Sequence, residues 1–147
     1  MSDDACLQSA EVIQRLPHRE PFLFLSRVIE VESGHEARGQ WLITGAEDYL
    51  RGHFPSKPIV PGVLVVESLA QLAGLILEAP HDQHQSLGML AHVDVRFERA
   101  VAPPATINLH ARAQRCMGQL QQFEVQADID GKSVARGTLV LAQGRTL

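Results

Sequence analysis

The chain has 147 residues, of which 45% are hydrophobic and 20% charged, and its formal net charge is −4. This length and composition predict one globular domain over residues 1–147 and exclude a disordered or low-complexity protein. The acidic balance argues against nucleic acid as a partner. The first residues lack the apolar core of a signal peptide, no segment is apolar enough to span a membrane, and two cysteines are too few for a disulfide scaffold. We therefore expect a cytoplasmic protein.

The first part of the chain predicts a short helix followed by two strands. Ser9 fits the N-cap of a helix that ends before Pro17. Residues 22–32 have the composition of a strand, Ser33-Gly34 that of a turn, and residues 35–44 that of the return strand. A loop rich in glycine and proline follows.

The clearest predicted element is a helix over about residues 61–78, which begins at Pro61-Gly62 and ends before Ala79-Pro80. Proline suits the first helical turn because its missing N–H would have no partner there. Apolar side chains occur around the whole circumference of this helix: Val63, Leu64, Val65, Val66, Leu69, Leu72, Leu75, Ile76 and Leu77. A helix that is apolar on all sides is expected to be buried on all sides, so the rest of the chain must surround it.

The second half of the chain predicts the strands that surround the helix. Residues 89–97 alternate in part, and residues 107–113 and 123–129 alternate between apolar and polar side chains. Asp130-Gly131 is a strong hairpin turn, and residues 134–141 form the last predicted strand. The total is five or six strands, mostly antiparallel, around one long central helix. This is an α+β domain of the arrangement called a hot dog.

One loop–helix unit carries side chains suited to acid–base chemistry. His53 lies on the proline-rich loop, and Glu67 lies in the apolar helix. Burying an unpaired carboxylate is costly, so we expect Glu67 to have a function. An imidazole exchanges protons near neutral pH, which suits a base, and apolar surroundings favour a protonated carboxyl group, which suits an acid. Gln71 lies one turn beyond Glu67 on the same face, where we expect a supporting hydrogen bond.

Structural interpretations of these side chains stay open. His53 could be a loop histidine bonded to backbone, Glu67 could pair with an arginine at a subunit interface, and Gln71 could be a plain buried amide. His81 and His84 have a spacing that occurs in metal sites, but no third ligand accompanies them. We therefore expect no metal site.

The loop and the helix that follows it resemble bacterial 3-hydroxyacyl-[acyl-carrier-protein] dehydratases of the FabZ type. The resemblance is strongest over Gly52-His53-Phe54-Pro55, Lys57-Pro58-Ile59, Pro61-Gly62-Val63-Leu64, Glu67 and Ala70-Gln71. It covers nearly the whole chain, and its other matching positions are Leu16-Pro17-His18-Arg19-Glu20-Pro21-Phe22, Val93-Asp94, Arg96-Phe97, Arg99, Val101, Pro103 and Asp130-Gly131-Lys132.

The resemblance implies a hot-dog fold and a homodimer, with a trimer of dimers as a further alternative. It implies a lyase that removes water from (3R)-3-hydroxyacyl-ACP to give trans-2-enoyl-ACP, in fatty-acid or related polyene biosynthesis. The active site lies at the dimer interface in this family, with His53 from one subunit as base and Glu67 from the other as acid. Glutamate rather than aspartate favours a dehydratase that does not also isomerise. The N–H groups of Gly62 and Val63 would receive the oxyanion.

The resemblance also implies a partner and a substrate carrier. The substrate is held on the phosphopantetheine of acyl carrier protein, and we expect no metal or redox cofactor. An acidic enzyme needs a local basic patch to bind an acidic carrier, and the candidates are Arg51, Lys57, Arg96 and Arg99, although each could be a solvated surface charge.

The chain departs from the family at Met89 and Leu90, where a tyrosine that gates the acyl tunnel is common. This difference leaves the acyl chain length and the pathway open. Two other functions stay open at this point. One is a hot-dog acyl thioesterase, and the other is a non-catalytic acyl-binding protein.

Overall fold

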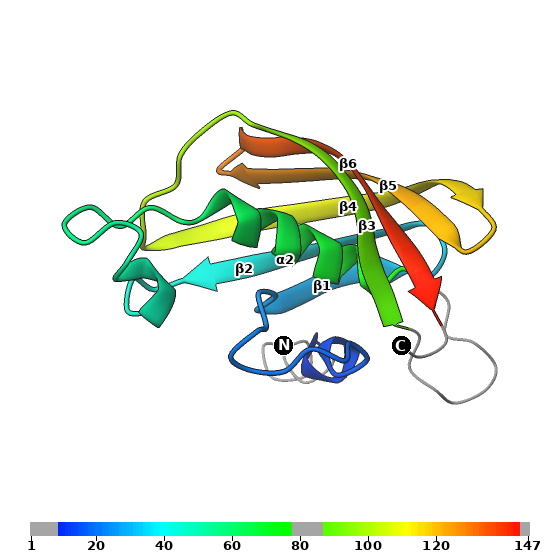
Figure 1. Ribbon diagram of the computed structural model, residues 1–147. Helices are drawn as coiled ribbons and strands as arrows, with labels where there is room; N and C mark the ends of the chain where they lie inside the picture. The colour runs from blue at the N-terminus through cyan, green and yellow to red at the C-terminus, as the bar shows by residue number, and fades with distance from the viewer. Residues whose placement is uncertain (1–8, 78–86, 145–147) are drawn as a thin grey trace.

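One antiparallel sheet curves around one main helix. The computed structural model describes residues 9–77 and 87–144. Its elements are β1 (Arg27–Glu32), β2 (Glu36–Ile43), the 3₁₀ helix η1 (Asp48–Leu50), α2 (Gly62–Gly74), β3 (Leu87–Phe97), β4 (Ala105–Met117), β5 (Leu120–Ile129) and β6 (Lys132–Gly144). The strand order is β1-β2-β4-β5-β6-β3, and every neighbouring pair is antiparallel. Figure 1 shows α2 lying along the sheet, with β3 and β6 curving past it. The predicted α+β arrangement is confirmed.

The core forms where the alternating strands meet the helix. Successive side chains of a strand point to opposite faces, so apolar residues at every second position share one face. In β4 and β5 these residues are fully buried: Ile107, Leu109, Ala111, Phe123, Val125 and Ala127. From α2, Leu69, Leu72 and Ala73 pack into the same core. The predicted hairpin turn between β5 and β6 is confirmed, because Asp130 and Gly131 both have positive φ, 51° and 79°.

The central helix is shorter and more open than predicted. It ends at Gly74 rather than at Glu78, which lies outside the described residues. After Gly74 the chain tightens into a turn, and the carbonyl of Ile76 accepts a hydrogen bond of 2.9 Å from the N–H of Gly34 in the β1–β2 hairpin. The first turn of the helix is not buried on all sides, since Val63 is 75% exposed.

The first strand is also shorter than predicted, since β1 begins at Arg27 and not at residue 22. The backbone of Phe22 and Phe24 binds the side chain of Gln71 on α2 instead of a neighbouring strand. Ser9 is not an N-cap, because it lies within a short helical segment over residues 9–13 and its hydroxyl accepts a hydrogen bond from the N–H of Val28.

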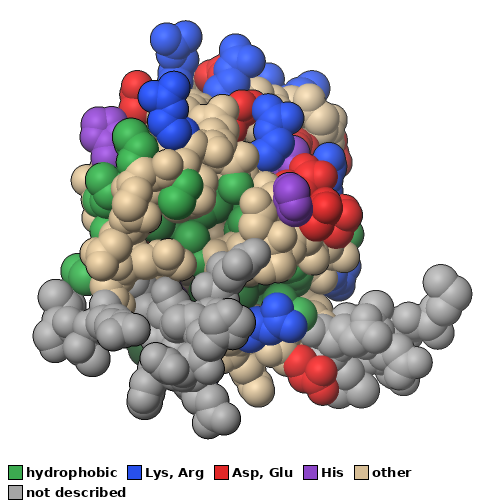
Figure 2. Space-filling view, turned by 90° about the vertical axis from the view of Figure 1, so that its right-hand side faces the viewer, with side chains coloured by type: hydrophobic (Ala, Val, Ile, Leu, Met, Phe, Trp, Pro, Cys, Tyr) green, Lys and Arg blue, Asp and Glu red, His purple; other side chains and the backbone are tan. Residues whose placement is uncertain are grey.

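Strand β3 stands at one edge of the sheet and has apolar side chains on both faces. Met89, Leu90, Val93 and Phe97 are all exposed large hydrophobic residues. Along its other edge β3 pairs with β6, and the two strands lie so close that a Cβ atom on Gly137 would overlap the carbonyl oxygen of Asp94. Figure 2 shows the side of the molecule at which β3 begins and β6 ends, with hydrophobic side chains gathered on one half and Lys and Arg along the upper rim.

Within residues 9–77 and 87–144, no helix has the length and apolar character needed to cross a membrane.

Candidate active site

His53 is held by hydrogen bonds to Ile59 across its own loop. Its Nδ1 lies 2.8 Å from the carbonyl oxygen of Ile59, and its own carbonyl accepts a hydrogen bond of 2.8 Å from the N–H of Ile59. A carbonyl oxygen only accepts, so Nδ1 must carry the proton and Nε2 is left as the basic nitrogen of the neutral ring. The ring also stacks on Phe54, with centroids 4.4 Å apart. The loop therefore fixes both the orientation and the tautomer of His53.

The start of α2 offers two backbone donors. The helix begins at Gly62 after Pro61, which has no side chain that could cap it. The first N–H groups of a helix have no partner inside the helix, and those of Gly62 and Val63 find no acceptor elsewhere in the described chain. The ring of Phe97 packs where a Cβ atom on Gly62 would stand, 2.9 Å from the nearest ring atom. Glycine thus lets an aromatic ring lie directly against this helix end.

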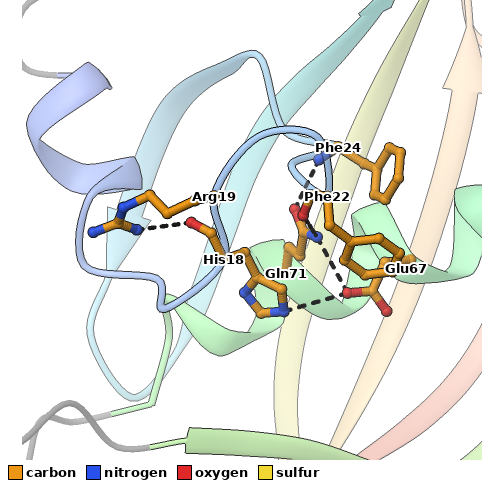
Figure 3. Close-up of polar contacts among 6 residues, drawn as sticks. All are labelled: His18, Arg19, Phe22, Phe24, Glu67 and Gln71. Atoms are coloured by element: carbon orange, nitrogen blue, oxygen red, sulfur yellow. Dashed lines mark hydrogen bonds and ion pairs between the residues drawn. The ribbon is translucent and has the colours of Figure 1, made fainter. Parts of the chain in front are cut away.

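Glu67 lies on α2, partly exposed, and its contacts converge on one carboxylate oxygen. Gln71 Nε2 donates a hydrogen bond of 3.1 Å to Oε1, and His18 Nε2 lies 3.4 Å from the same atom. No lysine or arginine of the described chain forms an ion pair with Glu67. Figure 3 shows the three side chains together. Among the described residues, no hydrogen bond or ion pair joins Glu67 to His53.

Gln71 is a buried amide whose hydrogen bonds fix its orientation. Its side chain is 1% exposed. Its Oε1 accepts from the N–H of Phe24 at 2.9 Å, and its Nε2 donates to the carbonyl of Phe22 at 3.2 Å and to Glu67. Because the two backbone partners settle which end of the amide is nitrogen, the group that faces Glu67 is a donor. Gln71 is therefore both a buried amide that binds backbone groups and a hydrogen-bond donor to Glu67, the two roles that the sequence left open.

The four candidate carrier-binding residues lie on two neighbouring segments. Arg51 and Lys57 are exposed on the His53 loop, and Arg96 and Arg99 are exposed at the end of β3 and just beyond it. A hydrogen bond of 2.8 Å from the N–H of Val60 to the carbonyl of Val101 joins the two segments. Arg51 forms an exposed ion pair with Asp48.

His18 is the residue of this region that sequence reasoning missed. A single histidine in a loop has no periodic pattern, and the family resemblance includes His18 only as one position of a matching stretch, with no role assigned to it. His81 and His84 lie outside the described residues. Among the residues that are described, no cluster of three or more His, Cys, Asp or Glu side chains is placed to hold a metal ion.

Comparison with known proteins supports one family. A family model described as a FabA-like domain matches residues 16–138. A 3-hydroxyacyl-[acyl-carrier-protein] dehydratase FabZ of Lactococcus lactis subsp. cremoris is 37% identical over 136 residues, which cover 92% of this chain and 94% of the relative. The protein of the same name from Bacillus velezensis is 34% identical over 139 residues, covering 94% of this chain and 99% of the relative.

Solved structures show the same fold. A chain from the dehydratase heterocomplex ApeI:P of Xenorhabdus doucetiae superposes with a TM-score of 0.76 at 22% identity, covering 92% of this chain and 91% of that chain. The fluoroacetyl-CoA thioesterase FlK superposes with a TM-score of 0.63 at 14% identity, covering 78% of this chain and 88% of that chain. At these identities the two structures establish the architecture alone. With the family match and the relatives at more than a third identity, they show that this chain is a hot-dog protein of the FabA-like family, of the FabZ type.

Proposed function

We propose that this protein is a 3-hydroxyacyl-[acyl-carrier-protein] dehydratase that acts in fatty-acid biosynthesis. The observation that carries the proposal is the hydrogen bond from His53 Nδ1 to the carbonyl of Ile59, because it leaves Nε2 unprotonated and oriented as a base. The relatives of more than one third identity that bear the dehydratase name support the choice of reaction.

The reaction needs one base, one acid and one site for negative charge. His53 Nε2 takes a proton from the carbon next to the thioester carbonyl. The developing charge moves to the thioester oxygen, where the N–H groups of Gly62 and Val63 receive it. The C–O bond to the 3-hydroxyl then breaks, and Glu67 gives that oxygen the proton with which it leaves as water. The products are the trans-2-enoyl thioester and water, with a protonated His53 and an ionised Glu67, and one proton transfer from His53 to Glu67 through solvent restores the enzyme.

A complete site requires a second copy of the chain. His53 and Glu67 of one chain share no hydrogen bond or ion pair, and each has its own partners. Strand β3 has an unpaired edge and exposed apolar side chains on both faces, a combination that favours pairing with another strand. Two copies related by a twofold axis would pair β3 with β3 and join the sheets. His53 of one protomer would then face Glu67 of its partner.

The acidic carrier protein would bind beside the entrance to this site. Arg51, Lys57, Arg96 and Arg99 lie on two hydrogen-bonded segments, one of which carries His53. Charge on such a rim guides an acidic partner and sets the rate of association more than the affinity. The substrate arrives on the phosphopantetheine arm of the carrier, and the chemistry needs no metal or redox cofactor.

The shared site is tested by complementation between two inactive variants. His53→Ala and Glu67→Gln are each expected to lose nearly all hydration of crotonyl-ACP and dehydration of 3-hydroxybutyryl-ACP. Co-expression with two different tags allows the mixed dimer to be isolated. One of its two sites then contains both His53 and Glu67, so the mixed dimer should recover about half of the wild-type activity. A mixed dimer as inactive as its parents would contradict a site built from two chains.

The same assay separates the alternative functions. A thioesterase would release free thiol from acyl-ACP or acyl-CoA, which a thiol reagent detects. A non-catalytic binding protein would bind the acyl thioester without forming an enoyl product, and Glu67→Gln would change nothing. A wild-type protein that neither hydrates nor dehydrates carrier-bound substrates would contradict the proposed function.

A further inference from the structure

His18 is held against Glu67 by its own loop. Its ring stacks on Phe22, with centroids 6.4 Å apart and planes 21° from parallel. The guanidinium of Arg19 donates to the carbonyl oxygens of Leu16 and His18, and so ties the backbone on both sides of Pro17. Figure 3 shows the imidazole and the amide of Gln71 both directed toward the same oxygen of the Glu67 carboxylate. This position is built by several contacts that involve no substrate.

The surroundings of His18 select one tautomer. Its Nδ1 is buried and has no hydrogen-bond partner within residues 9–77 and 87–144. A proton on this nitrogen would create a buried N–H without an acceptor, which is costly, whereas a bare nitrogen there costs less. The proton of the neutral ring therefore belongs on Nε2, the nitrogen that lies 3.4 Å from Glu67 Oε1. His18 faces the carboxyl group as a neutral donor.

Two side chains thus converge on one oxygen of Glu67. Gln71 donates a hydrogen bond of 3.1 Å to Oε1, and His18 Nε2 lies 3.4 Å from the same atom, an ion-pair distance without hydrogen-bond geometry. No hydrogen bond or ion pair from the described residues reaches Oε2. In a protonated carboxyl group one oxygen is an acceptor and the other carries the hydrogen. The hydrogen bond from Gln71 defines Oε1 as an acceptor and the Nε2–H of His18 faces the same atom, so the proton of the acid form of Glu67 belongs on Oε2.

We propose that His18 is a positioning residue that acts together with Gln71 on Oε1 of Glu67, and that Oε2 is the oxygen that gives its proton to the leaving hydroxyl. This inference rests on the proposed dehydratase function. When Oε2 releases its proton, Glu67 becomes negatively charged, and N–H donors on Oε1 stabilise that charge more strongly than they stabilise the neutral acid. His18 therefore acts on the chemical step and not on the binding of the substrate.

Three variants of His18 test this role by the reach of their side chains. His18→Gln places an amide nitrogen near the position of Nε2, whereas His18→Asn places the same group near Nδ1, and His18→Ala has no donor. Removing an N–H group that stabilises a nearby negative charge is expected to lower kcat about 10-fold. We expect the kcat of the Asn and Ala variants to fall about 10-fold with KM within about twofold of wild type, and the Gln variant to retain most of the wild-type kcat.

The outcomes distinguish this inference from the proposed function. The role of His18 would be overturned by Gln and Asn variants with equal kcat, or by an Ala variant with wild-type kcat. In either case, a Glu67→Gln variant that is inactive in the same assay would leave the dehydratase function in place. A loss that appears only in KM would also overturn it. The comparison of Gln with Asn stays decisive if the Ala variant does not fold, which circular dichroism would show. An inactive wild-type protein would overturn both proposals.

Discussion

Two histidine–glutamate pairs occur among the residues that the structure describes, and their surroundings differ. His110 and Glu36 lie 2.8 Å apart on the outer face of the sheet, with side chains that are each 30% exposed. His18 and Glu67 lie 3.4 Å apart beside α2, and their side chains are 26% and 21% exposed. The hydrogen bond from His110, the charge of His110 and the charges of Arg38 and Arg112 lower the pKa of Glu36, although partial burial opposes them.

The neighbours of the inner pair are of another kind. Glu67 accepts a hydrogen bond from the amide of Gln71, the ring of Phe22 stacks on His18, and no guanidinium among the described residues pairs with Glu67. Cationic neighbours keep the outer carboxylate ionised, which suits a structural ion pair. The inner carboxyl group has no lysine or arginine partner among the described residues, and we propose it as the acid of the reaction. A histidine beside a glutamate therefore identifies no function by itself, and the groups around the pair decide it.

The largest difference between the pairs should appear in activity. Glu67→Gln is expected to lower kcat by a factor of about 100 to 10,000, because the general acid is lost. Glu36→Gln, the same change in the outer pair, should leave kcat within about twofold, since no step of the reaction depends on an outer-face carboxylate. Steady-state assays with crotonyl-ACP compare the two variants directly. Similar losses in both would show that the comparison is wrong.

Stability should depend more on the inner region than on the outer one. Gln71→Leu removes a buried amide and leaves the N–H of Phe24 and the carbonyl of Phe22 without partners. We expect the free energy of unfolding to fall by about 2 kcal/mol, chiefly because the buried N–H of Phe24 loses its partner and a buried orphan group costs about 1–3 kcal/mol. Urea denaturation measures the change. Gln122→Leu on β5 is a matched control of the same type on a partly buried side chain, and it should change stability much less.

The His110–Glu36 pair should affect how the stability of the protein depends on pH in acid. Because the folded pKa of Glu36 is lowered from 4.5, the pair adds stability above that value and loses it as the pH falls through the folded pKa. Wild type should therefore lose more stability than Glu36→Gln between neutral pH and acid. Urea midpoints at several pH values measure this. Parallel curves for the two proteins would contradict the assignment.

The smallest expected effect lies in alkali, at the only tyrosine of the chain. Burial, followed by the charges of Glu47 and Glu20, raises the pKa of Tyr49 to about 12 from 10.0. Its ring packs edge-on against Phe24, so it reports on the interior next to Gln71. The unfolded chain loses this proton first, so stability should decline between pH 10 and 12. Tyr49→Phe should lack that decline, and the tyrosinate absorbance of the wild type measures the pKa directly.

The sequence predicted the fold best where periodicity was unambiguous. Alternation over residues 107–113 and 123–129 and the Asp130-Gly131 turn identified the central strands and their hairpin. The prediction from sequence was wrong where backbone groups bind partners that no local sequence pattern indicates. Residues 22–26 look like a strand, but the carbonyl of Phe22 and the N–H of Phe24 bind the side chain of Gln71 instead of a neighbouring strand. Residues 75–77 continue the apolar run of the helix although their backbone forms a turn.

The candidate site was predictable to a different degree. The family resemblance singled out His53, Glu67 and Gln71, and the roles of His53 and Glu67 stay predictions until variants are assayed. The tautomer of His53 follows from Ile59, whose carbonyl is placed by the folding of the loop and not by any motif. His18 approaches Glu67 from a distant part of the chain, so only the three-dimensional arrangement brings the two together.

The absent side chain of Gly137 limits how this protein can change. Its α-carbon lies so close to the carbonyl of Asp94 that even a methyl group would separate β3 from β6. Such a separation would displace β3, the strand that we expect to join two subunits. A single added carbon atom at position 137 would therefore disturb the proposed dimer as well as the fold of each chain.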